Sequence, residues 1–170
     1  MAQYPQILAG QRITAAQLTS MMPVEIYKLS NTDRASTVTL TDDPELTYTL
    51  EANAVYRVEA FLHYAAISAA GFQAAWTVPS GATGNRSALG AGSTQVSSDN
   101  VSGRFGVHAY GTAADYGDRA SASNQMFAYE ESILTTSSAG TLAVQWAQST
   151  SNATASRLAA GSSMRIKRLA

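Results

Sequence analysis

The sequence predicts an all-β protein, a jelly-roll β-sandwich preceded by a short N-terminal arm and helix. Much of the 170-residue chain falls into short runs in which apolar and polar side chains alternate, the pattern of a strand with one buried and one solvated face. Only one segment has helical spacing, and turn residues separate the runs at irregular intervals. About eight strands with a single helix are typical of a sandwich or jelly roll, not of a parallel α/β fold.

The clearest strand pattern lies in residues 55–64. The side chains that share its apolar face are Tyr56, Val58, Ala60, Leu62 and Tyr64. Residues 72–78 repeat the alternation, and a turn follows at residues 78–81, with Pro at its second and Gly at its fourth position. Phe61 is the one apolar residue on the polar side of the first run, and it is the residue that we expect in a contact between subunits.

The N-terminal segment predicts an extended arm followed by one short helix. Residues 1–11 are broken by proline and glycine, whereas Thr14 and Gln17 form a capping box that predicts a helix over residues 15–22. Two turns of helix are too short to stand alone in water and must dock, either on the same domain or on a neighbouring subunit. The chain therefore divides into an attachment arm with a short helix, residues 1–23, and a jelly-roll β domain, residues 24–170.

The remaining elements follow from alternation and turn residues. Strands are expected at residues 24–29, 37–41, 46–50, 104–110, 126–133, 141–147 and 164–167, with a loop at residues 30–36 and a turn at Asp42-Asp43-Pro44. Residues 81–125 are rich in small residues, and we expect long ordered loops there. The predicted core consists of Tyr56, Val58, Leu62, Trp76, Leu142, Val144, Trp146 and Ile166.

Composition and charge exclude several classes of function. A formal net charge of −1 gives no clustered positive charge for nucleic acid, and neither a signal peptide nor an apolar run long enough to span a bilayer is present. The chain has no cysteine, and its two histidines, His63 and His108, fall on separate elements. Adjacent carboxylates, such as Glu130-Glu131, point to opposite faces of a strand and are expected to be solvated. We expect no catalytic site, metal site or cofactor, and hence no enzyme.

Several stretches resemble a set of small virion proteins from tailed phages of actinobacteria. They are YPQILAGQRITAAQLTSMMP at the start, LTDDPELTYTLEANAVYRVEAFLHYAA, WTVPSGATG, and the closing GTLAVQWAQSTSNATASRLAAGSSMRIKRL. Similar segments end proteins described as head fibres, decoration proteins or minor tail proteins. The resemblance implies a compact jelly roll of the tumour necrosis factor and complement globular-head type, commonly a homotrimer. The chain lacks the repetitive shaft of a long fibre.

Two hypotheses about function follow. The first is a non-enzymatic capsid decoration or head-fibre protein on the virion surface, made in the host cytoplasm, whose arm grips the major capsid protein or a tail protein. The attachment residues would be Tyr4, Pro5, Ile7, Leu8, Leu18, Met21 and Met22. The alternative is a tail-fibre or minor tail protein that acts as a receptor-binding or carbohydrate-binding tip, in which residues 81–110 and 148–155 would contact a host surface glycan.

Overall fold

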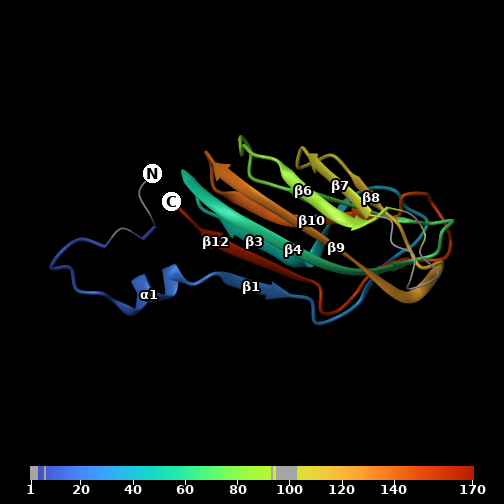
Figure 1. Ribbon diagram of the computed structural model, residues 1–170, viewed down its shortest axis with the longest axis horizontal. Helices are drawn as coiled ribbons and strands as arrows, with labels where there is room; N and C mark the ends of the chain where they lie inside the picture. The colour runs from blue at the N-terminus through green and yellow to red at the C-terminus, as the bar shows by residue number, and fades with distance from the viewer. Residues whose placement is uncertain (1–3, 6, 93, 95–102) are drawn as a thin grey trace.

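The computed structural model describes residues 4–5, 7–92, 94 and 103–170, and in them two antiparallel sheets form a sandwich (Figure 1). The larger sheet has the strand order β1 (Val24–Tyr27), β12 (Ser163–Arg168), β4 (Ala54–Ala66), β9 (Ser121–Thr136), β6 (Arg86–Ala91) and β7 (Gly103–His108), with β11 (Ser156–Leu158) and β2 (Thr32–Arg34) continuing beside β4. The smaller sheet has the order β3 (Thr41–Leu50), β10 (Gly140–Ala147), β5 (Phe72–Thr77) and β8 (Ala114–Tyr116). The predicted all-β sandwich is confirmed.

The path of the chain between the sheets is that of a jelly roll. Strands β3 to β10 alternate between the two sheets, except that β6 and β7 form a hairpin within the larger one. The result is the order β4-β9-β6-β7 facing the order β3-β10-β5-β8, which is the arrangement of two Greek keys. The strands β1, β12, β2 and β11 then widen the larger sheet on the β4 side.

The core lies between the inner faces of the two sheets. All eight residues of the predicted core are buried, which confirms the assignment of faces from alternation. Strands β4 and β5 follow each other in the chain but lie in opposite sheets, so their apolar faces meet. The rings of Tyr64 and Phe72 stack at 4.4 Å, and Phe72 stacks on Trp146 at 5.6 Å.

The predicted turn at Asp42-Asp43-Pro44 does not end the strand, because β3 runs from Thr41 to Leu50, but it marks an irregularity within β3. The register with β10 shifts between Asp42 and Thr47, and Asp43 Oδ1 accepts hydrogen bonds from the backbone N–H groups of Glu45 and Leu46. The Asp43 carboxylate lies in the core, where Lys28 Nζ at 2.9 Å and Trp146 Nε1 at 3.2 Å also donate to it and compensate its desolvation. Residues 37–40 lie outside the strands, and Val38 is exposed.

The sequence also misses four strands. Strand β2 falls in the predicted loop at residues 30–36, β6 and β8 fall in the predicted loop region 81–125, and β11 was not expected. Strand β7 lies where a strand was predicted, with Phe105 and Val107 on one side as expected, but that side faces solvent. Residues 95–102 of the predicted loop region lie outside the described residues. In the described part of the chain no helix is long and apolar enough to cross a membrane.

Helix α1 (Ala15–Met21) begins at the predicted capping box. The Thr14 side chain accepts a hydrogen bond from the Gln17 backbone N–H at 3.3 Å, and Gln17 Oε1 accepts one from the Thr14 backbone N–H at 3.0 Å. The helix ends one residue earlier than predicted, at Met21, and none of its residues is buried. It therefore stands beside the sandwich and contributes nothing to the core (Figure 1).

Candidate attachment and interaction surfaces

Two clusters of charged residues are buried in the sandwich, and the first surrounds Glu130. Its carboxylate accepts hydrogen bonds from Arg86 Nη1 at 2.6 Å, Trp76 Nε1 at 2.6 Å and the Tyr116 hydroxyl at 2.5 Å. Arg86 also donates through Nη2 to the backbone oxygens of Ala74 and Thr112. The prediction that Glu130 is solvated is wrong, because these partners replace water around a fully buried carboxylate.

This cluster has the properties of a structural site. Burial raises the pKa of Tyr116 well above its usual range, and the neighbouring Glu130 carboxylate adds to the rise, so the phenol stays protonated and donates. Arg86 and Glu130 are sealed from solvent between the sheets, where no substrate reaches them. The ion pair therefore cross-links β6 to β9, and the Trp76 indole adds β5 of the other sheet.

A second buried cluster joins β1 to β3. Lys28, directly after β1, donates through Nζ to both carboxylate oxygens of Asp43 and to Glu45 Oε2, each at 2.9 Å. The hydrogen bond from Lys28 holds the pKa of Glu45 below its usual value. Since β1 and β3 belong to different sheets, this cluster ties the sheets together at their edge.

The two histidines singled out from the sequence are separated. His63 lies on β4 and His108 on β7, as expected. Asp118 accepts hydrogen bonds from Ser68 Oγ at 3.0 Å and from the Ala120 backbone N–H at 2.7 Å, which is the behaviour of a turn residue. In the residues described, no group of three His, Cys, Asp or Glu side chains is placed to hold a metal ion.

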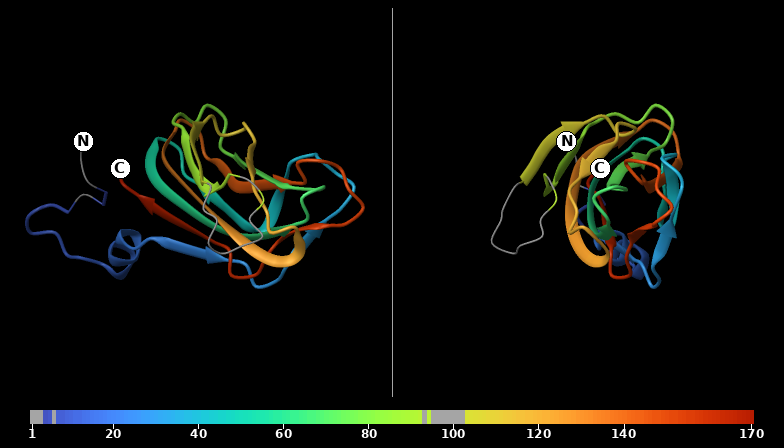
Figure 2. Two further views of the ribbon diagram at one scale, coloured as in Figure 1. Left: turned by 45° about the vertical axis from the view of Figure 1, so that its right-hand side comes forward. Right: turned by 90° about the vertical axis from the view of Figure 1, so that its right-hand side faces the viewer.

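The N-terminal arm leaves the sandwich and returns to it as a loop. Near its start, the Tyr4 backbone N–H donates to the Leu169 carbonyl at 3.0 Å, and the Tyr4 ring lies 4.0 Å from the guanidinium carbon of Arg168. From there the chain projects away from the sheets and comes back through α1 into β1 (Figures 1 and 2). Tyr4 and Pro5 are therefore half-buried against their own domain, whereas most residues of the projecting part are exposed.

The projecting loop and α1 carry a set of exposed apolar side chains. They are Ile7, Leu8, Ile13, Leu18, Met21 and Met22. Five of the seven residues named from the sequence as attachment residues belong to this set; the other two, Tyr4 and Pro5, pack on the domain. Ile13, which the sequence marks only as a helix-staple position, is added. Six exposed apolar side chains on one short projection form an exposed hydrophobic patch of the kind that marks an interaction site.

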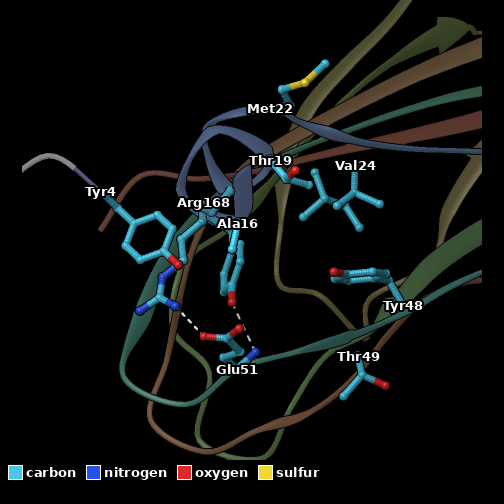
Figure 3. A pocket seen from close by; sticks show the side chains of 12 residues that line it. Tyr4, Ala16, Thr19, Met22, Val24, Tyr48, Thr49, Glu51 and Arg168 are labelled. Atoms are coloured by element: carbon cyan, nitrogen blue, oxygen red, sulfur yellow. Dashed lines mark hydrogen bonds and ion pairs between the residues drawn. The ribbon is translucent and has the colours of Figure 1, made fainter. Parts of the chain in front are cut away.

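A cavity of about 420 Å³ separates α1 from the end of the sandwich (Figure 3). Ala16 and Thr19 of the helix line one side, and Tyr48 and Arg168 line the other. Arg168 is held there by an ion pair with Glu51. Because this space lies under the helix, α1 makes few contacts with its own domain, which explains why it buries no residue.

Phe61 belongs to a row of large side chains on the outer face of the larger sheet. In the strand register Phe61 stands opposite Tyr129, Tyr129 opposite Leu89, and Leu89 opposite Phe105. The ring of Phe127 lies 5.5 Å from that of Phe61. We call Phe61, Leu89, Phe105, Val107, Phe127 and Tyr129 the apolar face. The Tyr129 hydroxyl donates to Glu59 at 2.9 Å, and burial together with this carboxylate raises the pKa of Tyr129 to about 12.

The loop at residues 148–155 lies at the opposite end of the sandwich from the arm. Strand β10 pairs with the end of β3 at Gly140 and runs away from the arm toward Gln148. The buried Gln148 side chain braces the loop, since Nε2 donates to the Thr154 carbonyl at 2.8 Å and Oε1 accepts from the Asn152 N–H at 3.0 Å. The structure therefore separates this loop from the surface that the sequence proposes for attachment.

Sequence reasoning finds Phe61 and misses the rest of the apolar face. In the region of β7, the sequence predicts a strand with Phe105 and Val107 on one side but does not indicate whether that side faces solvent. The pairing register of β4, β9, β6 and β7 brings these residues together, and it cannot be derived from the sequence of one strand alone. Strand β7 contains no buried residue and is an edge strand, so its apolar residues point to solvent.

The fold and these surfaces define a two-sheet all-β domain whose candidate sites are docking surfaces. No protein-family profile matches the chain, and no curated protein matches it. Among solved structures it is similar to the tripod (BppUct-A-L) from the baseplate of bacteriophage Tuc2009, at 12% identity over 99% of this chain and 75% of that chain, with a TM-score of 0.36. It is also similar to infectious bursal disease virus Gx strain, at 10% identity over 99% of this chain and 41% of that chain, and to the VP2 subviral particle of infectious bursal disease virus, at 10% over 99% and 46%, each with a TM-score of 0.21. At these TM-scores the similarities carry no argument about function.

Proposed function

We propose that the protein is a non-enzymatic structural protein of a phage virion, a capsid decoration or head-fibre protein that is held by its N-terminal arm and displays a trimeric β domain. The observation that carries the proposal is the projecting patch of exposed apolar side chains on residues 7–22, which the fold itself does not need. The resemblance of the arm, strand and C-terminal stretches to small virion proteins supports the virion as its place. The partner of the arm is the major capsid protein or a tail protein.

The geometry suits an anchor. A short capped helix and a loop with Leu8 and Met22 fully outside the sandwich can enter a groove without any rearrangement of the sheets. Burying such side chains stabilises a contact by about 1.5–3 kcal/mol each, so one arm gives a moderate affinity after the entropy of association is subtracted. A trimer that presents three arms would gain by avidity, typically about 100-fold or more.

A second candidate is a receptor-binding or carbohydrate-binding tip on a tail. The observation in its favour is that the braced loop at residues 148–155 lies at the end farthest from the arm, where a protein held by its arm meets the exterior. Residues 81–92, also named for recognition, run from the arm end toward this far end along β6. A host surface glycan would be the ligand under this alternative.

The test is attachment to phage particles that lack the protein. A variant with Leu8→Ser, Leu18→Ser and Met22→Ser removes apolar surface that is exposed in the free protein, so it should unfold at the same temperature as the parent. We expect its affinity for particles to fall at least about 100-fold, since each lost contact is worth about tenfold or more. Binding is measured by co-sedimentation of labelled protein with the particles.

The matched control is Leu29→Ser, which removes a leucine outside the arm that is more exposed than any of the three. It should bind particles as the parent does. Undiminished binding of the triple variant would move the docking surface from the arm to the β domain. The number of copies bound per particle separates the two candidates, because hundreds of copies indicate a capsid lattice and a few indicate a tail tip.

A further inference from the structure

The apolar face differs from the rest of the outer surface of its sheet. Ion pairs on this outer face join β1 to β12, through Arg165 and Glu25 at 3.0 Å, and β4 to β9, through Arg57 and Glu131 at 2.8 Å. On the side of β6 and β7, large apolar side chains take their place, with Phe105 77% exposed and Val107 68% exposed. The outer face of the larger sheet therefore has a polar part, whose charges are paired, and an apolar part that is exposed to solvent.

Strand β7 is also uncovered on its inner side. None of its six residues is buried, although the inner residues of its neighbour β6 are. In the end-on view of Figure 2 the yellow β7 lies at the outer margin of the sandwich, beyond the cover of the smaller sheet. Strand β7 carries one charged residue, Arg104, and no proline, so most of this edge remains open to association with another chain.

The size of the apolar face matches the needs of an oligomer. A large apolar side chain has about 150–250 Å² of surface, so the exposed fractions of Leu89, Phe105, Val107 and Phe127 together give roughly 500 Å² of apolar area per chain. A stable interface buries about 800 Å² on each partner, of which about 65% is apolar in homodimers, again roughly 500 Å². The apolar face is therefore large enough to supply the apolar core of one such interface.

The charges around the apolar face favour an identical partner. The outward charged residues of β1, β12, β4 and β9 balance in number: Glu25, Glu59 and Glu131 against Arg57, Arg165 and Lys167. Ion pairs within the chain satisfy most of them, so the sheet offers no excess charge to attract a strongly acidic or basic partner. Two copies can approach without the repulsion that like charges cause across an interface.

We propose that a second copy of this chain covers the apolar face, with the β6–β7 hairpin of one copy packed on the neighbour. The inference deepens the trimer of the proposed function by assigning its interface. It concerns the isolated protein and can be judged whether or not the arm binds particles. Phe61, the residue named from the sequence, lies at the inner margin of this interface, and Phe105 and Val107 lie at its outer margin.

The experiment compares two double variants at the two edges of the same sheet. Phe105→Thr with Val107→Thr removes the apolar side chains of β7, and threonine keeps a good strand propensity at exposed positions. The control is Tyr27→Thr with Leu29→Thr. Tyr27 is the last residue of β1, the opposite edge strand, and Leu29 lies two residues after it; they are 63% and 77% exposed. Masses are measured by sedimentation velocity at micromolar concentration, and tryptophan fluorescence checks that each variant is folded.

We expect the parent and the control to sediment as the same oligomer, and the β7 variant to sediment as a folded monomer. Its dissociation constant should rise at least about 100-fold, because two apolar side chains are lost from every copy and each is worth about tenfold or more. A monomeric parent, a β7 variant with the parent mass, or a control that dissociates equally would each overturn the proposal. Deleting residues 1–22 should leave the oligomer intact, and a monomer on that deletion would place the contact in the arm instead.

Discussion

Glu130→Gln tests the buried cluster most sharply. The change keeps the shape of the side chain but leaves the Arg86 guanidinium, which is completely buried, without its counter-charge. Removing one partner of a buried ion pair costs about 3–5 kcal/mol of unfolding free energy. The Gln amide group also meets the Trp76 N–H and the Tyr116 hydroxyl, both of which donate to the carboxylate.

For a chain of this length, a loss of 3–5 kcal/mol lowers the melting temperature by roughly 6–20 °C. The assay is urea unfolding at a fixed protein concentration, followed by the fluorescence of the two tryptophans, because one of them bonds to Glu130 directly. The control lies one residue away on the same strand. Glu131 pairs with Arg57 at the surface, and Glu131→Gln should cost no more than about 1 kcal/mol. If the two variants lose the same stability, the argument from burial is refuted.

Two further predictions concern the core. Trp146→Ala removes a buried ring that stacks on Phe72, and it should cost about 3–5 kcal/mol in the same urea assay; a midpoint equal to the parent's would contradict its burial. Burial raises the pKa of Tyr64, Tyr110 and Tyr116 in the folded protein, so stability is complete below pH 10, where these groups are protonated in both states, and falls as the unfolded chain ionises above it. Absorbance equivalent to these three tyrosinates should therefore appear only with alkaline unfolding, and ionisation of all eight tyrosines before unfolding would contradict the prediction.

Local patterns in the sequence determine the parts of the fold that it predicts correctly. The inner face of β4 follows from simple alternation, because one side of that strand faces the other sheet along its whole length. The cap of α1 follows from Thr14 and Gln17, which are three residues apart and need no other part of the chain. Both features are decided within a few residues, and so the sequence alone suffices.

The buried charges could not be predicted in this way. Asp43 depends on Trp146, which is 103 residues away in the chain, and Glu130 depends on Trp76 and Arg86, 54 and 44 residues away. Local reasoning sees an exposed acidic pair, and only the packed sheets supply the partners. Strands of three residues, such as β8, are likewise too short to show an alternation of their own.

The link between α1 and β1 determines how the domain responds to force. The helix passes into β1 within a few residues, so tension on the arm is delivered along the axis of β1. Strand β1 pairs with β12 through four residues, from Val24 opposite Ile166 to Tyr27 opposite Ser163, and antiparallel hydrogen bonds lie across the strand axis. Such a pull loads all of these bonds in shear at once. Lys28 binds Asp43 and Glu45 at the far end of the strand, and these ion pairs must also break before β1 can move along β12.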